Sequence, residues 1–182
     1  MKTELKGNKI LLRKLKTSDA KDIYENVKDK EVVKWTINIP HPYKLKDAVK
    51  FIRHSNYKLK KKKGINLGIA LKETNKIIGI ISLNTIDWKN KKAEIGYWLG
   101  KTHWNKGIMT EAVKLVLKLS FNELKLHRIY ARIFEENIGS RKVLEKNKFK
   151  QEAKLRDSLF KFGKYHNEIL FGLLKKEWKQ KY

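Results

Sequence analysis

The sequence predicts a mixed α/β fold, in which a mostly antiparallel sheet of about seven strands is covered by about four helices. Three observations support this prediction. Two apolar runs at residues 66–71 and 76–85, separated by four polar residues, are typical of a β-hairpin. A strong helical stripe over 108–121 is followed by another strand pattern at 127–134. The length of 182 residues fits a single domain with one core, to which we assign residues 1–182.

In the first half of the chain, strand and helix patterns precede the hairpin. Residues 9–15 have the alternating character of a strand, and the Thr-Ser-Asp sequence at 17–19 is typical of a helix N-cap. Apolar residues then recur at helical spacing over 20–27 and, after a Pro-His-Pro loop, over 48–59. Because another strand pattern at 93–99 follows the hairpin, we expect an antiparallel meander.

In the second half, the helix predicted at 108–121 is apolar over a wide face and should be buried against the sheet. It connects the strands at 93–99 and 127–134, so those two strands should run parallel. The remaining pattern predicts a short helix at 138–146, then strands at 149–159 and 165–174 that are joined by a turn at 161–164.

The composition limits the possible classes of function. Because the chain has no Cys, disulfides and thiolate metal sites are excluded, and we expect no metal. The sequence starts without the apolar stretch of a signal peptide, and its longest apolar run, Ile77–Ile81, is far too short to span a membrane. We therefore expect a cytoplasmic protein with no membrane partner, either a monomer or a homodimer.

The charge is strongly positive, with 44 Lys and Arg residues against 19 Asp and Glu residues and a net charge of +25. Such a charge favours polyanions, including nucleic acid and phosphorylated cofactors. The excess is mostly Lys, spread along the chain beside many Asn and Ile residues, as an AT-rich coding sequence produces whatever the function. We therefore do not expect direct nucleic-acid binding. The densest run, Lys58–Lys63, follows a helical pattern, where cations complement the helix dipole.

The segment Lys101–Ala112 lies between a predicted strand and a predicted helix. The first backbone N–H groups of a helix are unpaired and lie at the positive end of its dipole, so this turn could hold a phosphate or pyrophosphate. Gly107 would let a ligand approach the backbone closely. The segment is not a Walker loop, since the second Gly and the Lys-Ser/Thr pair are absent. An ordinary structural turn would account for one Gly equally well.

Two other segments carry groups suited to chemistry. Glu94 lies among apolar and aromatic residues, on the same strand face as Gly96 and Trp98, and a partly buried carboxylate there would suit general-base work. The alternative is a strand-edge Glu paired with a Lys. Asn137 and Ser140 begin the predicted short helix, where capping could account for one of them.

Five motifs follow one another along the chain: Leu-Leu-Arg at 11–13, Ile-Gly-Ile-Ile-Ser at 78–82, Ala-Glu-Ile-Gly-Tyr-Trp-Leu at 93–99, Trp-Asn-Lys-Gly-Ile-Met-Thr-Glu-Ala at 104–112, and Asn-x-x-Ser-x-x-Val-Leu-Glu-Lys at 137–146. In this order they resemble the GNAT superfamily of N-acetyltransferases, and within it the branch of bacterial ribosomal-protein N-terminal acetyltransferases that act on alanine or serine. The resemblance extends from Ile10 to Trp178. It implies a sheet whose fourth and fifth strands splay apart to admit acetyl-CoA.

The resemblance also implies roles for particular residues. The pantetheine arm of acetyl-CoA would pair with the backbone of Tyr97, Trp98 and Leu99 and accept a hydrogen bond from Asn137. The pyrophosphate would be held by N–H groups of the turn formed by Asn105, Lys106, Gly107, Ile108, Met109 and Thr110. The family's chemistry is direct attack of an amine on the thioester. We assign Glu94 as the base, directly or through water, and Ser140 as the acid.

Three positions depart from the family pattern. Leu144 stands where many members have a Tyr acid, so protonation of the thiolate falls to Ser140, to water or to no residue. Asn105 replaces a Gly of the phosphate turn but keeps its backbone N–H. Lys148 replaces the Gly that usually precedes Phe149, so the helix end should be locally reshaped.

By resemblance to that branch, the acceptor is expected to be a protein or peptide amine, in particular an α-amino group such as that of a ribosomal protein. Trp35, Tyr43 and Phe160 lie in loops that could flank an extended peptide. One alternative is a small amine, such as an antibiotic, a polyamine or an amino-acid analogue, of which polycations should be repelled by the positive charge. Another is a non-catalytic module that binds ribosomes or nucleic acid.

Overall fold

The computed structural model describes residues 4–179. Its strands are β1 (Glu4–Lys6), β2 (Ile10–Lys14), β3 (Ile65–Leu71), β4 (Ile77–Asp87), β5 (Lys92–Leu99), β6 (Arg128–Phe134), β7 (Lys150–Lys161) and β8 (Lys164–Leu174). Its α-helices are α1 (Ala20–Val27), α2 (Lys30–Val33), α3 (Leu45–Lys60), α4 (Ile108–Lys118), α5 (Ile138–Lys146) and α6 (Lys175–Lys179). Short 3₁₀ turns η1 (Thr17–Asp19) and η2 (Lys101–His103) and a π-helical turn η3 (Leu119–Glu123) complete the described elements.

All the described strands belong to one sheet, in the order β1-β2-β3-β4-β5-β6-β8-β7. Neighbours are antiparallel except β5 and β6, which run parallel as the intervening helix predicted. The mixed, mostly antiparallel sheet is thus confirmed. It has one strand more than expected because the short β1 pairs with β2, and the additional helices α2 and α6 are each about one turn long.

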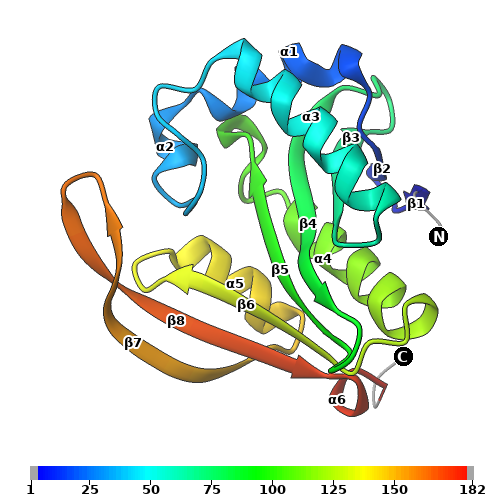
Figure 1. Cartoon of the computed structure of the whole chain (residues 1–182), viewed down its shortest axis with the longest axis vertical. Coiled ribbons are helices and arrows are strands. Elements are labelled where there is room, and N and C mark those ends of the chain that lie inside the picture. Colours follow the sequence, from blue (N-terminus) through cyan, green and yellow to red (C-terminus); the bar gives the residue numbers. More distant parts are fainter. Residues whose placement is uncertain (1–3, 180–182) are drawn as a thin grey trace.

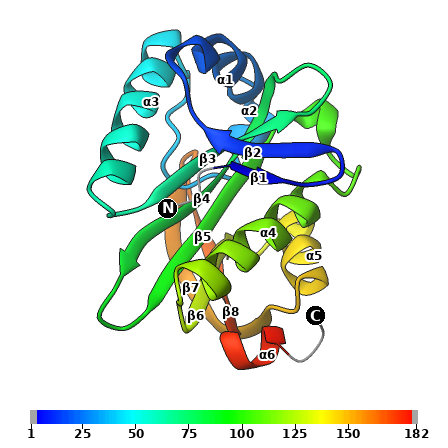
Figure 2. The same cartoon turned by 90° about the vertical axis from the view of Figure 1, so that its right-hand side faces the viewer.

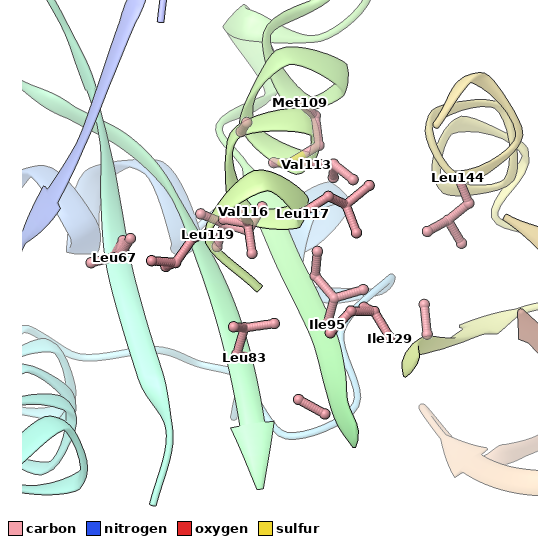
Figure 3. Packing of buried hydrophobic residues seen from close by; sticks show 14 of the residues in the cluster. Leu67, Leu83, Ile95, Met109, Val113, Val116, Leu117, Leu119, Ile129 and Leu144 are labelled. Atoms are coloured by element: carbon pink, nitrogen blue, oxygen red, sulfur yellow. The ribbon is translucent and has the colours of Figure 1, made fainter. Parts of the chain in front are cut away.

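Helices cover both faces of the sheet (Figures 1 and 2). On one face, α1 and α3 pack on β3 and β4 through side chains such as Ile23 and Ile52. On the other face, α4 and α5 pack against β5 and β6, with Val113 and Val116 of α4 among the core side chains in Figure 3. The predicted burial of α4 is confirmed, and this layer fixes the position of both strands that carry the site.

The residues predicted to cap the first helix behave differently. Thr17–Asp19 form η1, and no side chain caps α1. The carboxylate of Asp19 instead accepts hydrogen bonds from both Nη atoms of Arg13, at 2.8 and 2.9 Å, and from the backbone N–H of Lys16. The N-cap expectation is therefore wrong for Asp19, because a buried guanidinium requires this carboxylate as its partner.

The parallel pair β5 and β6 separates soon after it forms. Only Lys92–Glu94 of β5 pair with Arg128–Tyr130 of β6, although the strands continue to Leu99 and Phe134. Figure 1 shows the two strands meeting at one end and diverging toward the other. They are the fourth and fifth strands once β1 is set aside, so the expected splay is present. The backbone edges beyond Glu94 and Tyr130 are therefore free for a ligand.

Among residues 4–179, no helix is long and apolar enough to cross a membrane.

Candidate active site

A cleft of about 610 Å³ lies between the diverging ends of β5 and β6. Its walls are β5, the turn before α4, the end of β6 and the start of α5, and Val32, Trp35 and Thr36 line its far end. The residues that the resemblance assigns to acetyl-CoA, 97–99, 105–110 and Asn137, all line this cleft, and so does Ser140. Glu94 does not line it, because it lies at the last residue pair before the strands separate.

The turn before α4 presents backbone donors to the cleft. α4 begins at Ile108 with no side-chain cap, so the N–H groups of its first turn have no intrahelical partner. Gly107 has φ +76°, a left-handed conformation, and a Cβ added to it would meet nothing within 4 Å. Trp104 Nε1 donates to Leu99 O at 2.7 Å and ties the turn to the end of β5. The turn therefore offers open space beside uncapped donors, which suits an anion.

His103 lies at the edge of this turn and also lines the cleft. Burial, helped by the positive charge of Lys106, holds the pKa of His103 below its ordinary value. The imidazole is therefore biased toward its neutral form beside the predicted phosphate site. Its position in the cleft was not predicted from the sequence.

The start of α5 places Asn137 and Ser140 opposite β5. Asn137 Oδ1 accepts from the backbone N–H of Ser140 at 3.0 Å and caps the helix, which leaves the two N–H donors of the amide for other partners. Ser140 Oγ lies 2.8 Å from Tyr97 Oη. Burial raises the pKa of Tyr97 well above its ordinary value, against the opposing effect of the Ser140 hydrogen bond, so Tyr97 is a neutral phenol. The sequence indicated only a backbone role for Tyr97.

All three departures from the family pattern have a clear structural outcome. Asn105 adopts a left-handed conformation in the turn before α4, with φ +59°. Leu144 is completely buried and points from α5 into the core beside β6 (Figure 3), so it takes no part in lining the cleft. Lys148 keeps the left-handed conformation that a Gly would have, with φ +69°. The expected reshaping of the helix end is therefore wrong: α5 ends at Lys146, and Lys148 adopts the left-handed conformation in spite of its side chain.

Glu94 is one of three charged side chains, with Arg132 and Glu168, that are linked by ion pairs. Its side chain is 18% exposed, and its two carboxylate oxygens each lie 3.4 Å from a guanidinium nitrogen of Arg132 on β6. Arg132 lines the cleft, and its Nε is also 3.7 Å from Oε1 of Glu168 on β8. Burial acts to lower the pKa of Arg132, but the two carboxylates outweigh it and hold that pKa above its ordinary value. The partner of Glu94 is thus an Arg across the strand pair and not a Lys.

Glu168 was missed by the sequence interpretation. Only 2% of the residue is exposed; Oε2 accepts from Ser158 Oγ at 3.1 Å, whereas Oε1 has no hydrogen-bond partner. Glu168 pairs in register with Phe134, so it lies on the same sheet face as Arg132. The signal available in the sequence was a polar His-Asn-Glu run at the start of an otherwise apolar strand.

The far end of the cleft is partly aromatic. The ring of Trp35 packs edge-on against Phe134 at 6.4 Å, and Phe134 packs in the same way against His166 at 5.2 Å. His166 Nδ1 lies 3.1 Å from Oε1 of Glu136, which also lines the cleft. Of the three aromatic residues expected near the acceptor, Trp35 alone lines the cleft: Tyr43 packs on the core beneath α3, and Phe160 lies exposed on β7.

The β7–β8 hairpin reaches across this end of the cleft toward α2 (Figure 1). Lys161 Nζ donates to the carbonyl oxygens of Thr36 at 2.6 Å and Ile39 at 3.2 Å, and burial lowers the pKa of Lys161. Beside it, the rings of His41 and Phe162 pack edge-on at 6.0 Å. The hairpin is therefore fastened to the loop after α2, which narrows the approach to the cleft.

The cleft has N–H donors for an anion at the turn before α4 and two free strand edges along β5 and β6. Its lining includes the carboxylate of Glu136, and Glu94 adjoins it through Arg132. No group of three or more metal-binding side chains was found in the described part of the chain. These features suit an elongated ligand with a phosphorylated end and a reactive centre near β5 and β6.

Comparison with known proteins agrees with this geometry. The family model described as Acetyltransferase (GNAT) domain matches residues 9–150. The uncharacterized N-acetyltransferase p20 of Bacillus licheniformis is 35% identical over 170 residues, 93% of this chain and 95% of that protein. The ribosomal-protein-serine acetyltransferase of Escherichia coli (strain K12) is 27% identical over 153 residues, 84% of this chain and 85% of that protein. The solved structure of the microcin C7 self-immunity acetyltransferase MccE, in complex with acetyl-CoA and AMP, has a TM-score of 0.83 and 25% identity, covering 92% of this chain and 93% of that one.

Proposed function

Since the chain belongs to the GNAT family of acetyltransferases and uses acetyl-CoA, we propose that it acetylates the α-amino group of a protein or peptide, with ribosomal proteins as the first candidates. The observation that supports the proposal most strongly is the cleft: the turn before α4 fits the phosphates of acetyl-CoA, and Arg132 in the lining connects the cleft to Glu94, the proposed base. The similarity to the ribosomal-protein-serine acetyltransferase of Escherichia coli supports a protein acceptor. An α-amino group, with a pKa of about 8, also has a larger neutral fraction at pH 7 than a Lys side chain.

Acetyl-CoA would bind with its pyrophosphate at the turn 105–110 and its pantetheine between the free edges of β5 and β6. The uncapped first turn of α4 and the open space at Gly107 support the first contact. The unpaired backbone of 97–99 and the free N–H donors of Asn137 support the second. This placement brings the thioester to the level where Glu94 and Ser140 lie on opposite sides of the splay.

In the reaction, the amine nitrogen attacks the thioester carbon and forms the C–N bond. Glu94 accepts the amine proton, directly or through a water, and the unpaired N–H groups of β5 stabilise the oxyanion. The C–S bond then breaks, and Ser140 donates a proton to the departing thiolate. The hydroxyl of Tyr97, 2.8 Å away, supports this role because their hydrogen bond orients the Ser140 hydroxyl, and the proton that Glu94 releases to solvent is balanced by one that water returns to Ser140.

Glu94→Gln tests the base. We expect kcat to fall about 100-fold or more while the Kd for acetyl-CoA is unchanged, since general-base loss costs this much and the cofactor contacts remain. Glu152→Gln is the matched control, because it also removes a carboxylate paired with an Arg of β6, but that residue, Arg128, does not line the cleft as Arg132 does. Full activity of Glu94→Gln, with an unmoved pH profile, would show that Glu94 is only a structural partner of Arg132.

A small amine is the second candidate acceptor, and the fastening of the hairpin by Lys161 favours it because the approach to the cleft is narrowed. A competition assay separates the two. Peptides with a free α-amine, the same peptides with a blocked α-amine and a free Lys, and polyamines or aminoglycosides are compared by kcat/KM. A small amine well above every free-α-amine peptide would contradict the peptide acceptor and leave the acetyl-CoA assignment intact.

We also propose that residues 1–182 form one acetyltransferase domain and that it acts in the cytoplasm. The match over 9–150 and the continuous sheet support the first point. The absence of Cys from the sequence supports the second.

A further inference from the structure

Two lysine-rich segments that are distant in the sequence meet at one end of the sheet. Residues 58–63 end α3 and turn toward β3, and residues 89–92 form the β4–β5 turn. Trp88 Nε1 donates to Lys62 O at 2.9 Å, and Ile86 N donates to Lys63 O at 3.2 Å. In Figure 2 both segments lie along the left-hand edge, whereas α5 lies on the right. We call residues 58–63 and 89–92 together the basic pole.

The basic pole carries an uncompensated charge. Eight of its ten positions are Lys, against 44 Lys and Arg residues in the 182 of the whole chain. All but Lys58 are exposed, and within residues 4–179 none of the eight has an ion pair with a carboxylate. The adjacent Asp87 is held by Asn90 through hydrogen bonds of 2.9 and 2.7 Å. Codon bias raises the Lys content everywhere, but it does not bring two such runs into contact, and Asp87, which pairs in register with Lys92, is the carboxylate beside them.

Exposed aromatic rings accompany this charge. Trp88 is 45% exposed, and its hydrogen bond to Lys62 fixes the indole at the surface among the lysines. Tyr57, at the edge of the pole, is 54% exposed. A positively charged surface with exposed rings is the combination that binds single-stranded nucleic acid, because phosphates contact the cations and bases stack on the rings. An acidic protein or an anionic membrane would use the charge but leave the rings without a stacking partner.

We propose that the basic pole binds single-stranded nucleic acid, independently of the acetyltransferase cleft. β5 runs from the pole at Lys92 past Ile95, the first of its residues to line the cleft, to Leu99, which lies roughly 23 Å from Lys92 at about 3.3 Å per residue. A strand bound at the pole therefore leaves the predicted pyrophosphate turn, which follows Leu99, open. The proposal departs from the expectation, drawn from the spread of Lys along the chain, that nucleic acid is not bound directly.

The test uses the full chain and fluorescence anisotropy with labelled 12-nucleotide RNA and DNA strands over a range of salt concentrations. Replacing Lys60, Lys61, Lys62 and Lys63 by Gln should weaken binding at least tenfold at low salt. It should also reduce the slope of log K against log salt by about 3, since each single-strand phosphate contact contributes about 0.7. The matched control replaces Lys9, Lys21, Lys72 and Lys76 by Gln, which removes the same charge near the opposite ends of β3 and β4. The control should leave the slope nearly unchanged.

Trp88→Ala tests stacking, with Trp88→Phe as the variant that retains a ring. Trp88→Ala should weaken binding about 5-fold or more without changing the salt slope, and Trp88→Phe should recover most of the affinity. Acetyl-CoA turnover and melting temperature should stay near those of the native chain in every variant. An equal loss in the two Lys variants would overturn the proposal in favour of net charge alone. Polyglutamate or anionic vesicles that bind as tightly as the strands, with the same losses, would overturn it in favour of another polyanion.

Discussion

Gly107→Ala probes the predicted pyrophosphate site with one methyl group. The native residue has φ +76°, where a side chain is strained, and its Cβ position opens onto empty space in the cleft. Gly163, at the β7–β8 turn, is a matched control because it has φ +80° and its Cβ would likewise meet nothing within 4 Å. The two variants therefore share a backbone cost, and they differ in whether the methyl group lies beside the proposed phosphate.

The backbone cost of each substitution is about 1–2 kcal/mol, the penalty of a left-handed conformation for an L-residue. For a chain of this size it should lower the melting temperature by about 2–8 °C in both variants. The effect on binding should differ. If the methyl group at residue 107 displaces the phosphate from one charge-assisted N–H contact, about 1.5–3 kcal/mol is lost, which is roughly a 10- to 150-fold rise in the Kd for acetyl-CoA.

Titration calorimetry with acetyl-CoA, together with thermal unfolding, measures both quantities. Gly107→Asn is a useful third variant, because Asn tolerates the left-handed conformation better than Ala but still fills the space. It should destabilise the chain less than Gly107→Ala and weaken acetyl-CoA binding at least as much. The reasoning is refuted if Gly107→Ala binds acetyl-CoA within about twofold of Gly163→Ala at matched stability.

Three further predictions follow from buried or coupled polar groups. Asp19→Ala should cost about 3–5 kcal/mol in urea unfolding, because it leaves the buried Arg13 guanidinium without a counter-charge, and Arg13→Met combined with it should recover part of that loss. The pKa of His103 is lower in the folded chain than in the unfolded chain, so as pH falls through about 6.5 the unfolded chain takes up a proton first and the free energy of unfolding decreases. His103→Asn should therefore lose less stability than the native chain between about pH 7.5 and 5.5. Ser140→Ala and Tyr97→Phe should each lower kcat, and the double variant should lower it by less than the product of the two single effects, because the two hydroxyls share one hydrogen bond. If the fold-losses in kcat simply multiply, the two hydroxyls do not act together.

Periodicity predicted most of the fold because the elements obey local rules. The helix at 138–146 was predicted with the bounds observed for α5, and the parallel pairing of β5 and β6 followed from the connecting helix. The capping expectation at 17–19 failed because Asp19 is claimed by Arg13, whose position depends on β2. A local rule cannot predict a partner that only tertiary structure brings near.

In the site, too, features set by contiguous sequence could be predicted, and contacts set by tertiary structure could not. The motifs placed the acetyl-CoA residues in one cleft because strand, turn and helix are contiguous in the sequence. Arg132 and Glu168 were not predicted, because the pairing of Arg132 with Glu94 depends on the register of β6 against β5, and its pairing with Glu168 on the register of β8 against β6. The basic pole required the contact between Trp88 and Lys62, which joins segments separated by β3 and β4.

The charges near the cleft, and not the net charge of the chain, decide which acceptor is attracted. A charge of +25 predicts repulsion of polycations, but that argument requires the acceptor to experience the whole molecule. At physiological salt, exposed charges are screened beyond about 8 Å, so the nearest groups dominate. Near the acceptor these are Glu136, which lines the cleft, and Glu94 and Glu168 beside Arg132, against the guanidinium of Arg132 and the ammonium of Lys161, so the local charge does not repel a cationic amine. Discrimination between a peptide and a polyamine must therefore come from the shape of the cleft. Lys161→Met removes the hydrogen bonds that fasten the β7–β8 hairpin to Thr36 and Ile39. It should widen the approach to the cleft and raise kcat/KM for peptides more than for small amines.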